Sequence, residues 1–323
     1  MADLVGPEFW VIEESEIEIH PFTGLVEAVR RGDTGHVRGI MSSGLGLDAA
    51  PHPLPPMTPP LIEAVCAGHH DMVELFLDRK ANLNARDVAL GGTALHWAAA
   101  SGNKDLMATL MERAFDVNSP CYSGQTPLHV AAACGHDNIV RLLLSDNAQP
   151  DVVDLRGDTP LHEAAGGGHV PVCDALLSGR ANPNVANLDA ETPLHVAARR
   201  GYSGVVEALL AKGASLDAAN AAGITALINS AFFGHDPVVQ LLLQRGANAR
   251  AVDKKRRAAL HWAALNDHDA TVRNLIGWAA DSVRLLDEAG ATPLDLAMQA
   301  DAAHVISILR SLHKPDTKRH RPQ

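Results

Sequence analysis

The sequence predicts an all-α repeat solenoid, in which helix-turn-helix units are joined by short β-hairpin connectors. The first observation is internal repetition: Thr-Pro-Leu-His stands at residues 126–129, 159–162 and 192–195, and degraded copies surround it. A period near 33 residues is typical of stacked repeats. The second observation is composition, because 46% of the residues are hydrophobic but only 4% are aromatic. Many thin layers of Ala and Leu suit this composition better than one large core. The repeated leucines are residues 25, 61, 95, 128, 161, 194, 227, 260 and 294.

Each copy begins with the pattern of a short first helix. In the copy at residues 126–154, Thr126 suits the N-cap, and Pro127 suits the first helical position, where its missing N–H costs nothing. His129 stands three residues after the cap, from where a side chain can bond back to the cap backbone. We therefore assign these residues a structural capping role. The same role is predicted for Thr159, His162, Thr192 and His195.

A second helix and a polar connector complete the unit. Gly135 is placed to end the first helix, and Ile139, Val140 and Leu143 form an apolar stripe on the second. Residues 151–157 are polar and rich in turn formers, so we expect a hairpin that leads to the next Thr-Pro. One unit cannot bury its own apolar face, whereas a stack of units buries a continuous core.

These motifs resemble the ankyrin-repeat family. The match rests on the Thr-Pro-Leu-His-x-Ala-Ala, Gly-His and Gly-Ala-Asn stretches and covers roughly residues 21–312. The resemblance implies a non-enzymatic scaffold or adaptor that binds another protein along the concave surface formed by connector tips and first helices. It is specific for the fold and says little about the partner, because one fold supports many functions.

The chain divides into three expected parts. Residues 1–20 carry six acidic residues without Lys or Arg and are expected to form a flexible acidic segment. Residues 21–312 hold about nine repeats, with the first and last as caps, and residues 313–323 form a basic flexible tail. A proline-rich insertion at 51–60 is expected to replace the first connector with an irregular loop. A second insertion, near 277–281, should alter the second helix or turn of the eighth copy.

Composition and charge exclude several classes of protein. The chain has 27 basic and 38 acidic residues, and a net charge of −11 disfavours direct binding of nucleic acid. Its four cysteines form no C-x-x-C pair and no disulfide framework, which indicates a reducing compartment. Neither a signal peptide nor a membrane span is expected. We therefore expect a cytoplasmic protein, with the nucleus as a second compartment that the basic runs allow.

No pattern indicates catalysis or metal binding. The capping histidines recur once per repeat, and helices stacked about 8–10 Å apart cannot share a zinc ion whose ligands lie about 2 Å from it. There is no G-x-S-x-G elbow and no cysteine in a catalytic context. The glycines at 166–168 close a helix instead of opening one after a strand, unlike a phosphate-binding loop. We expect no enzyme activity, metal, cofactor or small-molecule substrate.

The predicted partner-binding residues are variable side chains beside the paired alanines of the first helices. Arg and aromatic residues dominate binding hot spots. The best predicted patch consists of Arg199, Arg200, Phe232 and Phe233, with Tyr202 at its edge. The two phenylalanines also suit a partly buried role within the stack. Other predicted contacts on the same surface are Trp97, Glu163, Asn229 and Trp262.

A run of four basic residues lies in the connector before the eighth copy. It consists of Lys254, Lys255, Arg256 and Arg257, and Arg256 replaces the expected turn glycine. Three interpretations stay open: a solvated tip, a contact for an acidic partner, and a nuclear-import signal. An acidic protein or an extended peptide is therefore the expected kind of partner.

Two other functions are kept as hypotheses. A substrate-recruiting subunit of a ubiquitin ligase would append a helical box, but only eleven polar residues follow Leu312. A nuclear transcriptional regulator would use the basic runs. The family resemblance also implies a modification, because connector asparagines of ankyrin repeats can be hydroxylated. The matching positions are Asn84, Asn118 and Asn184.

Overall fold

The computed structural model describes residues 21–44, 58–113 and 115–312. The predicted acidic segment 1–20, the basic tail 313–323 and most of the proline-rich insertion lie outside these ranges. The described residues form eighteen α-helices and one 3-10 helix without a β-strand, which confirms the helical repeat fold. The predicted hairpin strands are not confirmed. Within the described ranges, isolated β-pairing is limited to a single bridge between Val252 and Ala258.

Contacts divide the chain into two compact units, which meet in sequence at Ala89 and Leu90. In the first unit, Phe22, Ile62 and Phe76 are fully buried. The Arg30 guanidinium lies 2.7 Å from the Glu63 carboxylate, which joins the first and third helices by an ion pair. The helices of this unit are α1 (Pro21–Arg31), α2 (Thr34–Ser42), α3 (Pro60–Cys66) and α4 (His70–Asp78).

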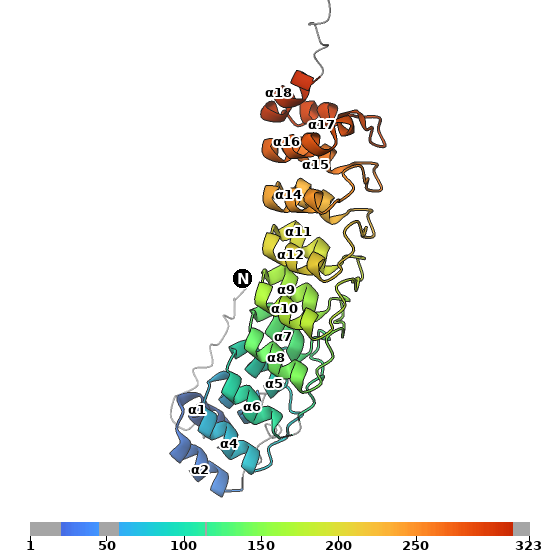
Figure 1. Ribbon diagram of the computed structural model, residues 1–323. Helices are drawn as coiled ribbons and strands as arrows, with labels where there is room; N and C mark the ends of the chain where they lie inside the picture. Colours follow the sequence, from blue (N-terminus) through green and yellow to red (C-terminus); the bar gives the residue numbers. More distant parts are fainter. Residues whose placement is uncertain (1–20, 45–57, 114, 313–323) are drawn as a thin grey trace, which may run out of the picture. The chain divides into compact units, whose positions relative to one another are not determined.

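The second unit contains seven helix pairs that form two layers. Each first helix contacts the first helix of the next repeat, and each second helix contacts the next second helix. The connectors lie along one side of the first helices (Figure 1). The helix bounds are α5 (Ala94–Ser101), α6 (Lys104–Met111), α7 (Pro127–Cys134), α8 (Asp137–Ser145), α9 (Pro160–Gly167), α10 (Val170–Ser178), α11 (Pro193–Arg200), α12 (Ser203–Ala211), α13 (Ala226–Phe232), α14 (Asp236–Gln244), α15 (Ala259–Leu265), α16 (Asp269–Trp278), η1 (Ala280–Arg284), α17 (Pro293–Gln299) and α18 (Ala303–Leu312).

Small buried residues allow the first helices to approach one another closely. In α7, Ala131 and Ala132 are fully buried, and Leu128 between the layers is almost fully buried. Gly135 follows the helix in the left-handed conformation, with φ 79°. A side chain at Gly135 would also meet the His169 ring of the next repeat, since an added Cβ would lie 2.7 Å from it. This glycine therefore serves both the helix end and the repeat junction.

The turns after the second helices are joined by a ladder of side chains. The N–H of Gln149 donates to Asn118 Oδ1 at 2.9 Å, and the N–H of Ser215 donates to Asn184 Oδ1 at 2.7 Å. Arg250 holds the matching position in the seventh copy and cannot accept such a bond. It forms an ion pair with Asp281 instead. The next turn is rebuilt, because α16 has 10 residues and is followed by η1, as the insertion near 277–281 predicts.

A capping box begins each first helix of the Thr-Pro-Leu-His copies. In α7 the Nδ1 atom of His129 accepts the N–H of Thr126 at 3.1 Å. In α9 and α11 the same bond joins Thr159 to His162 and Thr192 to His195, again at 3.1 Å. All three imidazoles are buried. Burial lowers the pKa of each below its ordinary value, so each is neutral near pH 7.

We predict that the fold loses stability as the pH falls below about 6.5. In the unfolded chain these histidines titrate near 6.5, whereas the folded chain resists protonating them. Stability is therefore full above about pH 6.5 and decreases through the window between 6.5 and the lowered pKa values. The loss is at most about 1.4 kcal/mol per histidine per pH unit. Urea unfolding followed by circular dichroism at pH 7.5, 6.5 and 5.5 measures it.

The matched control for this prediction is His162→Gln. A glutamine oxygen can accept the N-cap N–H but does not titrate, so this variant should show a shallower pH dependence than the wild type. A urea midpoint that stays constant from pH 7.5 to 5.5 would contradict the prediction.

Candidate partner-binding surface

The capping histidines also hold the connectors against the first helices. Their Nδ1 atoms accept hydrogen bonds, so the proton is on Nε2, which donates to a carbonyl of the next connector. The Nε2 atoms of His129, His162 and His195 lie 3.0 Å from the carbonyl oxygens of Asp158, Glu191 and Ile224, in that order. First helices and connectors therefore form one ordered surface, on which the predicted contact residues can be located.

Three aromatic side chains from neighbouring repeats lie together on this surface. The ring of Phe232 is 4.7 Å from that of Phe233 and 5.2 Å from that of Trp262, both in edge-to-face geometry. Phe233 is 45% exposed, whereas the other two rings are half-buried. The indole N–H of Trp262 donates to Asp253 at 3.0 Å, which fixes that ring. The arrangement supports both interpretations of the phenylalanines, because Phe232 packs in the stack and Phe233 faces outward.

The two neighbouring arginines of α11 have different environments. Arg199 donates to both carboxylate oxygens of Glu191, at 2.8 and 2.7 Å. Arg200 is exposed and forms no ion pair with another described residue. Only Arg200 therefore presents an uncompensated charge to a partner. We call Arg200, Phe232, Phe233 and Trp262 the aromatic patch.

Tyr202 takes the place of a histidine at a repeat junction. In four other copies this residue is a histidine that donates to the preceding first helix, as His235 does to the Arg199 carbonyl at 2.9 Å. Tyr202 packs against Gly168, where an added Cβ would lie 3.0 Å from the ring. It is 38% exposed. The predicted edge residue of the patch thus contributes mainly to packing between the fifth and sixth copies.

Two other predicted contact residues lie deeper than expected. Asn229 is buried in α13, and its amide donates to the His195 carbonyl at 3.3 Å. This side chain joins two first helices and lies inside the stack. Trp97 is half-buried on α5 and is separated from the aromatic patch by several repeats.

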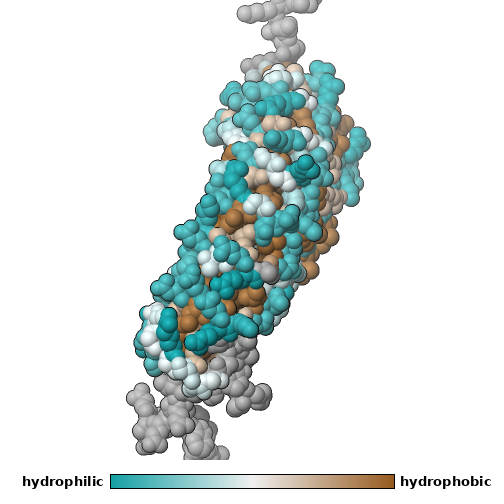
Figure 2. Space-filling model, turned by 60° about the horizontal axis from the view of Figure 1, so that its bottom comes forward, coloured by the Kyte–Doolittle hydropathy of each residue, from teal (hydrophilic) through white to brown (hydrophobic). Residues whose placement is uncertain are grey.

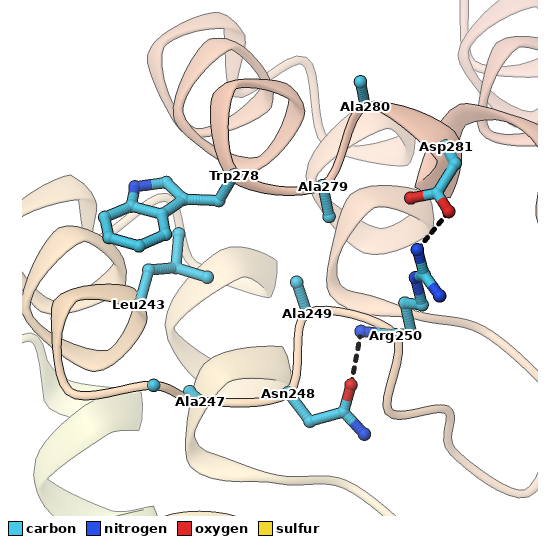
Figure 3. A pocket seen from close by; sticks show the side chains of 10 residues that line it. Leu243, Ala247, Asn248, Ala249, Arg250, Trp278, Ala279, Ala280 and Asp281 are labelled. Atoms are coloured by element: carbon cyan, nitrogen blue, oxygen red, sulfur yellow. Dashed lines mark hydrogen bonds and ion pairs between the residues drawn. The ribbon is translucent and has the colours of Figure 1, made fainter.

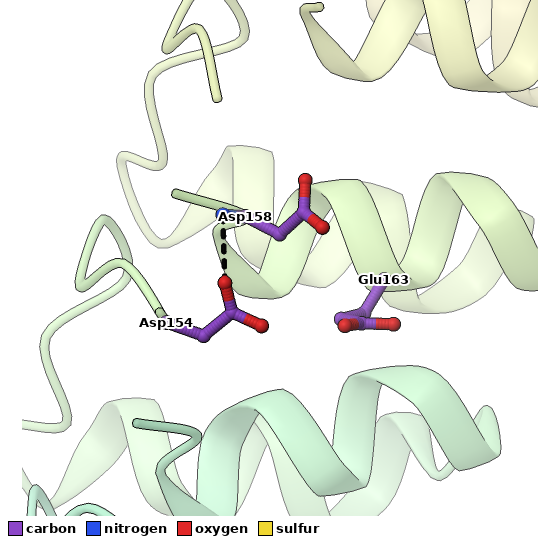
Figure 4. Close-up of side chains that lie close together, drawn as sticks. All are labelled: Asp154, Asp158 and Glu163. Atoms are coloured by element: carbon purple, nitrogen blue, oxygen red, sulfur yellow. Dashed lines mark hydrogen bonds between the residues drawn. The ribbon is translucent and has the colours of Figure 1, made fainter. Parts of the chain in front are cut away.

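Glu163 belongs to an acidic cluster together with Asp154 and Asp158 (Figure 4). The Arg156 guanidinium lies 2.6 Å from Glu163, 3.3 Å from Asp158 and 3.4 Å from Asp154, so it supplies the positive charge that a metal ion would otherwise provide. Burial raises the pKa of Glu163, and the two aspartates add to this, while Arg156 and Gln125 oppose it. Glu163 is therefore an internal partner of Arg156.

The basic run is divided between surface and interior. Lys254, Lys255 and Arg256 are exposed and form no ion pair with another described residue. Arg257 is half-buried: its Nε atom lies 3.1 Å from the Asp287 carboxylate, and its guanidinium lies 5.0 Å from the centre of the Trp262 ring. Three of the four cations thus face outward at the connector tip.

The asparagines predicted to be hydroxylated share one local structure. The backbone N–H groups of Asn84, Asn118 and Asn184 each bond to the side chain two residues earlier, at 3.0 Å. The side chains of Asn118 and Asn184 are members of the ladder described above. Nothing in this geometry tests the modification, which stays a prediction.

Sequence reasoning missed a row of exposed apolar residues at the connector tips. Tyr122, Leu155 and Leu188 are 63%, 70% and 78% exposed, and we call them the tip row. Their spacing of 33 residues was visible in the sequence, but single exposed apolar residues are ordinary and carried no signal there. Apolar atoms are visible between hydrophilic side chains along the edge where the connectors lie (Figure 2).

A separate cleft opens beside the rebuilt turn of the eighth copy. Trp278 is 59% exposed at the end of α16 and lies beside Leu243 (Figure 3). The Arg250–Asp281 ion pair closes the other end of the cleft. This cleft lies at the ends of the second helices, away from the tip row.

The stacked helix pairs and aligned connectors define a helical repeat protein with an extended surface. A family model described as ankyrin repeats (3 copies) matches residues 25–121, 61–154, 147–220, 205–285 and 227–319. The chain therefore belongs to the ankyrin-repeat family. The crystal structure of the human ASB11 ankyrin repeat domain is similar, with 26% identity and a TM-score of 0.63, over 69% of this chain and 99% of that chain. No curated protein matches the sequence.

Membership of this family has consequences at the level of class. Ankyrin repeats form protein–protein interaction domains, and proteins built from them are generally non-enzymatic interaction modules. The described helices include none that is long and apolar enough to cross a membrane.

We predict that Arg156→Met destabilises the fold by about 1–2 kcal/mol. The substitution leaves the three carboxylates of the acidic cluster without their shared cation, and all three are largely buried. Arg200→Met is the matched control, since Arg200 is an exposed arginine outside any described ion pair, and it should change stability by less than about 0.5 kcal/mol. Urea unfolding at pH 7.5 compares the two. Equal midpoints for both variants would refute the charge-balancing role.

Proposed function

We propose that this chain is a scaffold or adaptor that binds a protein partner through the aromatic patch. The observation that carries the proposal is that Phe233 is exposed, while Phe232 and Trp262, the two rings grouped with it, are half-buried. The whole chain has only six Phe, four Trp and two Tyr, and three of these twelve side chains gather at this point. Arg200 ends α11, which contacts α13, the helix that precedes Phe233. An exposed aromatic ring together with an arginine that forms no ion pair with a described residue has the composition of a binding hot spot.

The geometry lowers the cost of binding at this patch. Contacts with Phe232 and His235 hold the Phe233 ring, and the Asp253 hydrogen bond holds Trp262. A side chain that is already ordered loses little conformational freedom when a partner covers it. Arg200 adds a charge that favours an acidic group on the partner. The patch is therefore suited to an aromatic or aliphatic anchor with an acidic neighbour.

The cytoplasm, with the nucleus as a second compartment, belongs to the same proposal. Lys254, Lys255 and Arg256 are accessible at one connector tip, which supports an import signal. The ligase-subunit and transcriptional-regulator alternatives remain hypotheses, because no contact among the described residues favours either one.

We expect Phe233→Ser combined with Arg200→Ala to reduce capture of the principal partner by roughly tenfold or more. Both side chains are exposed, so circular dichroism should show an unchanged fold. Affinity purification with quantitative mass spectrometry compares the variant with the wild type. Trp278→Ser is the matched control, since it removes an exposed aromatic residue from the other side of the repeats.

Two results distinguish the outcomes of this experiment. A partner that is lost with the double variant and retained by Trp278→Ser supports the aromatic patch. If the double variant captures the same proteins in the same amounts as the wild type, the patch does not bind the partner.

The hydroxylation hypothesis has its own measurement. We expect peptides containing Asn84, Asn118 or Asn184 to carry one added oxygen when the protein is isolated from cells that contain asparaginyl hydroxylases. Tandem mass spectrometry locates the oxygen, and peptides with Asn248 serve as an internal control. If all three target peptides retain their unmodified masses, this hypothesis is removed.

A further inference from the structure

We propose that the connector tips bind one extended segment of a protein partner, with an apolar side chain at every third position and an acidic cluster at one end. The proposal concerns a surface distinct from the aromatic patch and rests on the proposed scaffold role. It commits to a polyproline-type conformation of the bound segment. The argument starts from the tip row and continues to the basic connector.

The tip row is aligned by backbone hydrogen bonds between successive connectors. The N–H of Leu155 donates to the Ser123 carbonyl, and the N–H of Leu188 donates to the Arg156 carbonyl, both at 3.0 Å. Tyr122 makes the equivalent bond to the Leu90 carbonyl at 2.9 Å. The three exposed side chains therefore hold the same place in three neighbouring connectors.

The spacing of this series selects the conformation of a matching partner. Each connector also contains a hydrogen bond of its own, such as the one from the N–H of Asp154 to the Asp158 carbonyl at 2.9 Å. Each repeat therefore adds two hydrogen-bonded backbone segments to the series. Backbone segments joined in this way lie about 4.7–4.9 Å apart, which places equivalent tips roughly 9.5 Å apart. A polyproline helix repeats every three residues and about 9.3 Å. The two other regular conformations fit the tip spacing less well. Seven residues of α-helix span about 10.5 Å, and a β-strand places every third side chain on the opposite face.

The charge along the tips gives the partner a direction. Beyond Leu188 the same place is held by Ala221 and then by Lys254, whose N–H groups continue the series at 2.9 and 3.0 Å. Lys254, Lys255 and Arg256 are exposed, whereas Arg156, the one cation in the connectors of the tip row, is compensated by carboxylates. Two further steps correspond to about six residues of a polyproline helix. The acidic cluster of the partner should therefore lie about six residues beyond its last apolar anchor.

The backbone at Arg256 supports a binding role for the basic connector. Arg256 has φ 58°, in the left-handed region, whereas the matching residues of five other connectors are Gly91, Gly124, Gly157, Gly223 and Gly290. Ala190, with φ 57°, is the second non-glycine residue at this place, but it carries no charge. A side chain with a Cβ is unfavourable there. An arginine at this position therefore places a cation at the tip at the expense of local stability, as residues at binding sites often do.

The test uses the full chain and a random library of 18-residue peptides displayed on phage. Selected peptides are synthesised with a fluorescent label, and their dissociation constants are measured by anisotropy. We expect the selected sequences to share apolar residues at every third position and Asp or Glu about six residues beyond the last one. Leu155→Ser with Leu188→Ser, and separately Lys254→Glu with Lys255→Glu, should each weaken binding by at least about tenfold. Phe233→Ser should change it by less than about twofold.

The variant Arg256→Gly separates a loss of binding from a loss of folding. Glycine suits the left-handed backbone, so this variant should raise the melting temperature while it weakens binding of the selected peptides several-fold. Weaker binding by a more stable protein supports contact at the tip. Unchanged binding in this variant and in the two-lysine variant overturns the acidic half of the proposal.

The remaining outcomes separate this proposal from the proposed function. Selected peptides with apolar residues at every seventh position would show that the partner is helical and would overturn the extended conformation. Peptides whose binding depends on Phe233 and not on Leu155 or Leu188 would overturn the tip proposal while supporting the aromatic patch. Peptides that depend on neither would overturn the tip proposal alone, because the aromatic patch is judged by capture of the natural partner.

Discussion

A single kind of side chain, the histidine at the third position of five of the first helices, connects the local and the repeated structure of this protein. In α7 the Nδ1 atom of His129 caps its own helix, and Nε2 holds the next connector through the Asp158 carbonyl. Because one ring makes both bonds, the position of each connector follows from the helix before it. The regular arrangement of the tips, and hence any surface built on them, depends on this pair of bonds.

The seventh copy shows what happens where this histidine is absent. Ile228 replaces it, and the Thr225 hydroxyl caps the helix by accepting the Ile228 N–H at 3.3 Å. The next connector then lacks its imidazole donor. Its internal bonds, in which Asp253 accepts the N–H groups of Lys255 and Arg257, match those that Asp154 makes in a connector with the imidazole donor, and the bridge between Val252 and Ala258 is added here. This is the connector that carries the basic run, so the change in anchoring and the change in surface charge coincide.

Local features of the sequence were sufficient to predict the helices, because caps, helix-ending glycines and small buried alanines act within one or two repeats. The rebuilt turn of the eighth copy was predicted for the same reason. Side-chain pairing was not predictable, since Arg199 and Arg200 are neighbours in sequence and only Arg199 reaches Glu191. Glu163 read as a surface acid, but Arg156 on the preceding connector reaches it. Such pairings depend on how residues from adjacent connectors and helices meet in space, and a repeat pattern does not contain that information.

The positions that break the repeat rule are the most informative ones for function. In a stack of equivalent units, each standard residue is explained by its bond to the neighbouring unit, so a departure requires another local explanation. Tyr202 and Arg250 have such explanations, since one packs against Gly168 and the other pairs with Asp281. Arg256 has none within the described residues: it shares the glycine position with Ala190, but it alone adds an exposed cation there, without an ion pair to a described residue. The proposed partner would supply this explanation, and its expected acidic character follows from the charge that Arg256 shares with Lys254 and Lys255.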